Sequence, residues 1–206
     1  MYDKFIPAAA DYVRFAPEIL LTVFGTLIML IEAGRKEDER RPYAILSLIA
    51  LAGAIYLSFP AYANPGPAFQ SMLIVDGFGT FFRVLCFVAA ALAILCSGQY
   101  LRREKHDSGE YYSLILFSVV GQGVMVTANE LIMVFIGLEI SSIATYVLAG
   151  YLRDDKRNNE SALKYFLLGS CATAFLLYGI AWIYGLTGST DLTLIRASLG
   201  SANPPN

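Results

Sequence analysis

The sequence predicts an all-α integral membrane protein with six transmembrane helices in a single domain over residues 1–206. Of the 206 residues, 56% are hydrophobic and only 16% are charged, and the mean hydropathy is +0.55. The charges are unevenly placed, because six apolar windows hold 128 residues but only five of the 32 Asp, Glu, Lys and Arg residues. Each window is about as long as a helix must be to cross the hydrocarbon core of a bilayer. This distribution excludes a soluble protein.

The six predicted helices, in chain order, cover residues 15–34, 43–63, 77–98, 111–128, 131–151 and 161–186. They are apolar around most of their circumference, as helices surrounded by lipid or by other helices are. A helix also satisfies its own backbone in lipid, and the windows lack the alternation typical of barrel strands. The first window is predicted to be a retained helix rather than a signal peptide, since no small-residue cleavage site follows Gly34.

The distribution of Lys and Arg predicts the orientation in the membrane. The loops after the first, third and fifth predicted helices carry ten of these residues, whereas the N-terminus, the other loops and the tail carry three. Because basic residues are enriched in cytoplasmic loops, both termini are expected outside the cytoplasm.

Composition also limits the partners and cofactors that this chain can bind. The net charge is −2 and no long basic tract is present, which does not favour nucleic acid. Cys86, Cys96 and Cys171 lack the spacing of a zinc site or a disulfide framework. With a single histidine, His106, the chain is expected to bind no haem, iron-sulfur cluster or other cofactor.

Two of the five charges within the windows lie near helix ends. Glu18 follows Pro17 at a helix start and is predicted to be an interfacial cap that can meet Arg14 four residues earlier. Glu32 lies within about one turn of the basic residues at 35–36 and has a similar explanation.

Arg83 and Lys164 have two open explanations. Arg83 lies roughly 9 Å from the outer end of its predicted helix and Lys164 roughly 5 Å from a cytoplasmic start. Each side chain is long enough to snorkel to the interface, and each could instead serve an intramembrane function. Apart from Arg83, which is permanently protonated, the outward half of the windows offers no ionisable relay group.

Glu139 is the strongest candidate for intramembrane chemistry. It is the ninth of 21 residues in its window, where a charged carboxylate costs on the order of 3 kcal/mol. Ser142 and Tyr146 follow on the same helix face and could anchor water. The alternative is a permanently hydrogen-bonded, structural glutamic acid. Lys164 differs in depth from Glu139 by about 13 Å, so a direct ion pair is not expected, although a water-linked relay is possible.

Two segments have a distinctive sequence, GLEISSIATYVLAG over residues 137–150 and ALKYFLLGS over residues 162–170. The first contains Glu139 and the second Lys164. The stretch 109–191 that contains them resembles the subunit N family of the proton-pumping NADH-quinone oxidoreductases, or respiratory complex I. Earlier helices agree more loosely, through PEILLTVFGTLIMLIE and VDGFGTFFRVL.

The resemblance implies an antiporter-like fold and a membrane-arm subunit that moves protons in the plasma (inner) membrane of a bacterium. By this resemblance, Glu139 matches the channel glutamate and Lys164 the lysine of the sixth helix. Redox chemistry, with NADH, flavin, iron-sulfur clusters and quinone, is then expected in the rest of the complex, and the partners are other membrane-arm subunits. Family members continue well beyond this length, so the sequence is expected to be an N-terminal portion.

Two other classes of function remain open from the sequence. One is an antiporter-like subunit of a related cation/proton exchanger or of a membrane hydrogenase. The other is a six-helix scaffold without transport, for which Glu139 would be dispensable.

Overall fold

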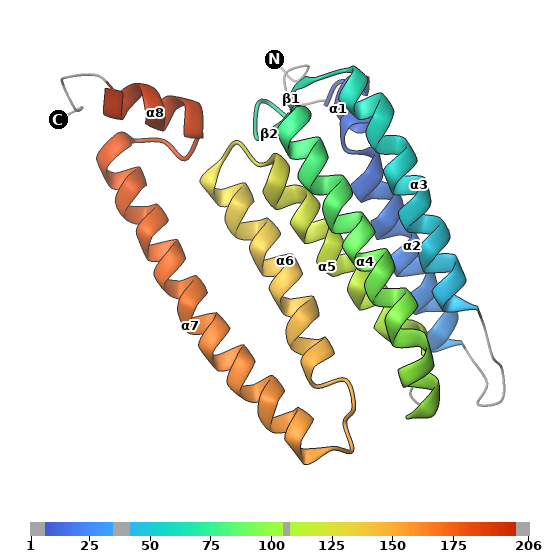
Figure 1. The fold of residues 1–206 in the computed structure, drawn as a ribbon. Helices are drawn as coiled ribbons and strands as arrows, with labels where there is room; N and C mark the ends of the chain where they lie inside the picture. The colour runs from blue at the N-terminus through green and yellow to red at the C-terminus, as the bar shows by residue number, and fades with distance from the viewer. Residues whose placement is uncertain (1–6, 35–41, 105–107, 201–206) are drawn as a thin grey trace.

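The computed structural model describes residues 7–34, 42–104 and 108–200. Six long helices run alongside one another (Figure 1): α2 (Ala16–Ala33), α3 (Tyr43–Ala63), α4 (Gly77–Arg103), α5 (Gly109–Thr127), α6 (Leu131–Ala149) and α7 (Lys156–Thr187). Two short helices, α1 (Ala9–Arg14) and α8 (Leu192–Gly200), lie at one end of the bundle together with the strands β1 (Gly66–Ala68) and β2 (Leu73–Val75). We call this end the hairpin end. The predicted all-α membrane fold is confirmed.

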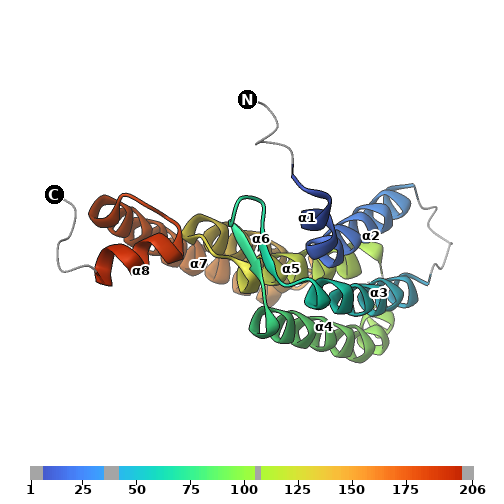
Figure 2. The same cartoon turned by 90° about the horizontal axis from the view of Figure 1, so that it is seen from above.

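α5 differs from the other five long helices, which are each long and apolar enough to cross a membrane. It packs against α2, α3, α4 and α6 and lies among them when the bundle is viewed from the hairpin end (Figure 2). It is also the helix with the most buried residues among those described, including Ser113, Ser118 and Thr127. A helix enclosed by protein can carry these hydroxyls because they bond to its own carbonyls or to neighbouring helices.

The backbones of α5 and α6 touch at a pair of glycines. A Cβ added to Gly121 would lie 2.5 Å from the carbonyl oxygen of Gly137 and 2.6 Å from the amide nitrogen of Ser141. A Cβ on Gly137 would likewise lie 2.7 Å from the Gly121 carbonyl oxygen. Beside this contact, the hydroxyls of Ser118 and Ser141 share a hydrogen bond of 3.0 Å between the two helices. Small residues allow this close approach, which is a common basis of helix association in membranes.

Two helices extend beyond their predicted bounds. α4 continues five residues past the expected end at position 98, to Arg102 and Arg103, where cations favour a helix C-terminus. α7 begins five residues before the expected start at position 161, because the side chain of Asp155 caps it by accepting a hydrogen bond of 2.9 Å from the Arg157 amide. Lys164 is therefore the ninth residue of α7 and not the fourth.

The connection between α3 and α4, at 64–76, contains a β-hairpin. β1 and β2 pair antiparallel, with Pro67 opposite Ile74, and Phe69, Gln70 and Ser71 in its turn have φ between 50° and 71°. Three consecutive left-handed residues are costly, so other segments must hold the turn. Asn129 does this by donating a hydrogen bond from its side chain to the Ser71 carbonyl oxygen at 3.0 Å.

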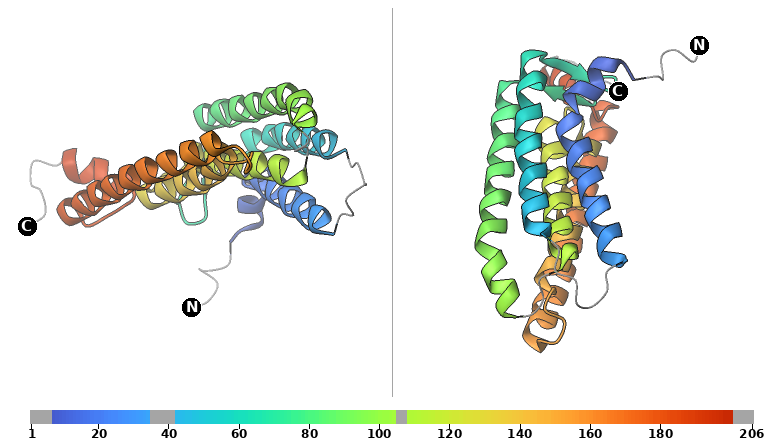
Figure 3. Two further views of the ribbon diagram at one scale, coloured as in Figure 1. Left: turned by 90° about the horizontal axis from the view of Figure 1, so that it is seen from below. Right: turned by 90° about the vertical axis from the view of Figure 1, so that its right-hand side faces the viewer.

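A second group of polar contacts joins the loop between α5 and α6 to the turn before α8. The Thr190 hydroxyl donates to Glu130 Oε1 at 2.6 Å, and Asn129 Nδ2 lies 3.4 Å from Asp191 Oδ2. The Thr193 hydroxyl and nearby backbone amides donate to Asp191 and lower the pKa of this partly exposed carboxyl. These contacts fix α8 across the end of α7, and Figure 3 shows the arrangement from two further sides.

The close contact between α5 and α6 makes Gly121 sensitive to substitution. We expect Gly121→Ala to lower the free energy of unfolding by about 1–3 kcal/mol, since the added methyl group meets backbone atoms that cannot rotate away. Gly185→Ala is the matched control, because a Cβ at Gly185 meets nothing within 4 Å. Thermal unfolding of the purified chain in detergent, followed by circular dichroism, measures both variants. Equal stability of the two would contradict the proposed contact.

Candidate functional site

Glu139 lies near the middle of α6, as the ninth of its 19 residues. One of its carboxylate oxygens, Oε1, is buried and accepts no hydrogen bond from any residue that the structure describes. Buried polar atoms in proteins nearly always have a hydrogen-bond partner or an ordered water. This oxygen is therefore free of protein donors and can accept a proton or a hydrogen bond from water.

Glu139 points away from α5 and toward the side of α6 that meets α7. Gly137 and Ser141 on α6 contact the α5 backbone at Gly121. Because a helix turns by about 100° per residue, Glu139 lies roughly half a turn around from the middle of that contact. Tyr146, seven residues further along, shares the face of Glu139.

Tyr146 marks where this face meets α7. Its ring centroid lies 4.8 Å from that of Tyr165 and 5.7 Å from that of Phe166, both in edge-to-face geometry. Its hydroxyl also contacts Gly169, at the place where the Cβ of any larger residue at position 169 would lie. The carboxylate of Glu139 and the ring of Tyr146 thus lie along the interface between α6 and α7.

Lys164 lies on a different side of α7. Its side chain is 69% exposed and its Nζ lies 2.5 Å from Oε1 of Glu160, one turn earlier. At about 100° per residue, Lys164 lies roughly 140° around α7 from Gly169, which faces α6. Exposed pairs of this kind contribute little to stability, at most about 1 kcal/mol.

The structure does not bring the two predicted site residues together. Along α6, Glu139 lies about 10 Å from Tyr146, toward the hairpin end. Along α7, Lys164 lies about 7 Å from Gly169, away from the hairpin end. Since Tyr146 contacts Gly169, the two charged residues differ in depth by well over 10 Å. The expectation that no direct ion pair joins them agrees with this geometry.

The prediction that Glu18 is an interfacial cap is wrong. Glu18 and Arg83 are both fully buried, and Arg83 Nε lies 2.9 Å from Glu18 Oε1. The two atoms form a charge contact whose N–H is not aligned as a hydrogen bond. Arg83 therefore does not snorkel, and the half of the bundle toward the hairpin end contains a carboxylate that was expected at the surface.

Gly123 on α5 makes room for this ion pair. A Cβ at that position would lie 2.5 Å from Glu18 Oε1 and 3.2 Å from its Cγ. The pair joins α2 to α4, and the carboxylate rests directly on the backbone of α5. The signal that could have identified the pair is opposite charge on two apolar helices, near the ends that lie at the hairpin end of the bundle.

Arg14, the expected partner of Glu18, is used elsewhere. Its guanidinium donates hydrogen bonds to the carbonyl oxygens of Asn64 at 2.9 Å and Pro67 at 2.6 Å. It also lies 3.7 Å from Asp11. Arg14 thus anchors the hairpin.

Glu32 was expected to lie beside the basic residues at 35–36. Those two residues lie outside the described part of the chain.

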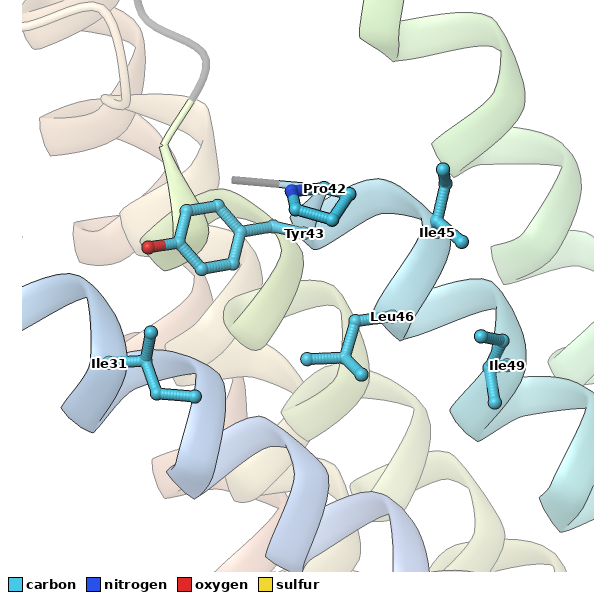
Figure 4. A pocket seen from close by; sticks show the side chains of 6 residues that line it. All are labelled: Ile31, Pro42, Tyr43, Ile45, Leu46 and Ile49. Carbon is cyan, nitrogen blue, oxygen red and sulfur yellow. The ribbon is translucent and has the colours of Figure 1, made fainter. Parts of the chain in front are cut away.

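A cavity of about 270 Å³ opens between the ends of α2 and α3 that lie away from the hairpin end (Figure 4). Apolar atoms from Ile31, Pro42, Tyr43, Ile45, Leu46 and Ile49 line it. Its surface offers no group for proton transfer. No cluster of three or more potential metal ligands occurs within residues 7–34, 42–104 and 108–200.

Residues 128–204 match the family model described as "NADH:quinone oxidoreductase/Mrp antiporter, TM". This segment includes Glu139 and Lys164. The match and the bundle of apolar helices define the class of this chain, an antiporter-like membrane protein.

Two relatives are subunits N of NADH-quinone oxidoreductases. Subunit N 1 from Solibacter usitatus is 56% identical over 90% of this chain and 38% of its own length. Subunit N from Trichlorobacter lovleyi is 41% identical over 88% of this chain and 37% of its own length. The chain belongs to the subunit N family of NADH-quinone oxidoreductases, and it spans somewhat under two-fifths of these two relatives.

Solved structures share the fold. Respiratory complex I from Thermus thermophilus with bound aureothin contains a chain that is 28% identical, with a TM-score of 0.70 over 91% of this chain and 39% of that chain. An archaeal membrane-bound sulfane sulfur reductase gives a TM-score of 0.73 at 19% identity, over 92% of this chain and 40% of that chain. The second similarity concerns the fold alone.

The buried ion pair can be tested by removing its members singly and together. Glu18→Gln and Arg83→Met are each expected to lower the free energy of unfolding by about 3–5 kcal/mol, because each leaves a buried charge unpaired. The double variant should lose clearly less than the sum, since it leaves no unpaired charge. Thermal unfolding in detergent measures the cycle. Additive losses would show that the two side chains do not interact.

Proposed function

We propose that this chain forms part of a proton-translocating membrane subunit of NADH-quinone oxidoreductase, which couples quinone reduction by NADH to proton pumping. Relatives up to 56% identical support the assignment to this complex, and Glu139 supports a part in the proton path. The proposal assigns no redox chemistry to this chain itself. NADH, flavin, iron-sulfur clusters and quinone belong to the other subunits of the proposed complex.

The single observation that carries the proposal is the state of Glu139. A carboxylate at the middle of an apolar helix is costly when charged, so it gains and loses charge according to its surroundings. Its Oε1 has no donor within the described part of the chain, so no protein hydrogen bond holds it in one state. A fixed, structural glutamic acid would have such a bond. Glu139 is therefore assigned the role of proton acceptor and donor.

Lys164 is assigned an indirect role. Its charge is paired with Glu160 and lies on a face of α7 away from α6. At this separation the proton does not pass directly between Lys164 and Glu139, so Lys164 acts through its electrostatic potential or through water.

The proposed partners are the lipid bilayer and other membrane-arm subunits of the complex in the bacterial inner membrane. α7 is consistent with such partners, because only Ile180 of its 32 residues is buried within the described chain. A related exchanger or hydrogenase subunit remains the second candidate, since the matched family model also names antiporters. If the protein purifies together with flavin and iron-sulfur subunits, this favours the NADH-quinone oxidoreductase. If these subunits are absent, this favours the related exchanger or hydrogenase.

The distribution of basic residues predicts that the hairpin end faces the periplasm. In a variant without the native cysteines, a cysteine at Asn64 should react with a membrane-impermeant maleimide added to intact cells, whereas one at Glu104 should react only after permeabilisation. Both positions are exposed and lie at opposite ends of the bundle. The reverse labelling pattern would overturn this orientation.

Glu139→Gln in the assembled complex should lower proton translocation about tenfold or more, and coupled electron transfer should fall with it. The substitution removes titration but keeps the size of the side chain, and losing a positioned acid–base group has effects of this size or larger. NADH-driven quenching of a pH-sensitive dye in inverted membrane vesicles, together with NADH oxidation, measures the two rates. Lys164→Met should have a smaller effect.

Glu110→Gln is the matched control for this experiment. Glu110 is partly exposed at the end of α5, where Oε2 lies 3.5 Å from Arg153. Both rates should stay near those of the unmodified complex. Unchanged translocation in a fully assembled Glu139→Gln complex would exclude Glu139 from the proton path.

A further inference from the structure

Three aromatic rings close the interface between α6 and α7 on the face that carries Glu139. Tyr146 of α6 packs edge-to-face against Tyr165 at 4.8 Å and Phe166 at 5.7 Å between ring centroids. We call these three residues the aromatic plug. Tyr146 is 9% exposed, whereas Tyr165 and Phe166 are 47% and 49% exposed, so Tyr146 is the ring that the described chain encloses.

The plug depends on small residues at two levels. The Tyr146 hydroxyl occupies the position that a Cβ at Gly169 would take. Closer to the α6–α7 loop, a Cβ at Gly150 would lie 2.8 Å from the Cβ of Ala162. The two helices therefore approach closely on both sides of the plug, toward the end where α6 stops and α7 begins.

The position of the plug relative to Glu139 gives it a function. Tyr146 lies on the same face as Glu139, about 10 Å nearer the α6–α7 loop. A water chain along this face from Glu139 to the aqueous phase at the loop would pass the level of the three rings. Lys164 stands outside the plug, on the far side of α7.

We propose that the aromatic plug is the barrier that prevents Glu139 from exchanging protons freely with the aqueous phase at the α6–α7 loop. The ring of Tyr146 provides the barrier, and Tyr146→Phe separates this role from any relay through the hydroxyl. Packed rings exclude the hydrogen-bonded water through which a proton would otherwise leak. The inference rests on the proposed role of Glu139.

The barrier is tested in the assembled complex reconstituted into liposomes. Passive proton leak is measured without NADH under an imposed pH gradient, and the number of protons translocated per NADH oxidised is measured separately. Tyr146→Ala should raise the leak at least threefold and lower the proton-to-NADH ratio. Tyr146→Phe, which keeps the ring, should leave the leak as it is in the unmodified complex.

Two further variants keep the test independent of any damage to folding at Tyr146. Gly169→Ala places a methyl group against the plug from α7 and should raise the leak by displacing the Tyr146 ring. Tyr146→Phe combined with Gly169→Ala should keep the raised leak, because the added Cβ would still lie 2.6 Å and 2.8 Å from the ring atoms Cζ and Cε1. Tyr178→Ala is the matched control, since Tyr178 is a 62% exposed aromatic residue of α7 that packs only on Trp182 among the described rings.

The double variant Tyr146→Ala/Glu139→Gln shows whether the leak passes through Glu139. A leak that returns to the level of the unmodified complex supports the proposal. A proton leak that persists in the double variant would overturn it. So would assembled Tyr146→Ala and Gly169→Ala complexes whose proton leak equals that of the unmodified complex. The proposed function has its own test and would be contradicted if the Glu139→Gln complex translocated protons normally.

Discussion

The backbone contact between α5 and α6 at Gly121 and Gly137 determines where the charged groups of this bundle can lie. α5 touches α6 through Gly121, and on another side it accepts the Glu18 carboxylate against Gly123. With Gly137 turned toward α5, Glu139 must turn toward α7, because two residues along a helix correspond to about 200°. Gly121 and Gly123 of α5 therefore lie between a buried ion pair and a carboxylate oxygen that has no donor among the described residues.

The intramembrane carboxylates show how the same side chain takes different roles in a bilayer. Glu18 contacts a buried guanidinium, so its charge is compensated and joins two helices. Glu139 has no such partner in the described chain, where its Oε1 is buried without a hydrogen-bond donor.

Lys164 and Glu139 belong to neighbouring helices but to different environments. Glu139 faces the interface of α6 and α7, whereas Lys164 is exposed beside Glu160 on the outer side of α7. The aromatic rings of Tyr146, Tyr165 and Phe166 occupy the interface near the level of the lysine. Coupling between the two charges must therefore act across α7 or through groups outside the described chain, and not through a shared hydrogen bond.

The sequence by itself determined the membrane fold, the approximate helices and the candidacy of Glu139, because hydropathy, length and depth are properties of single segments. It failed at Glu18 and Arg83. Local spacing offered Arg14 as the partner of Glu18, yet Arg14 binds hairpin carbonyls 50 or more residues away. Which helices meet, and with which faces, depends on side-chain fit at positions such as Gly121, Gly123 and Gly169. Only the tertiary structure decided those contacts, since a sequence specifies the residues on a helix face but not what packs against it.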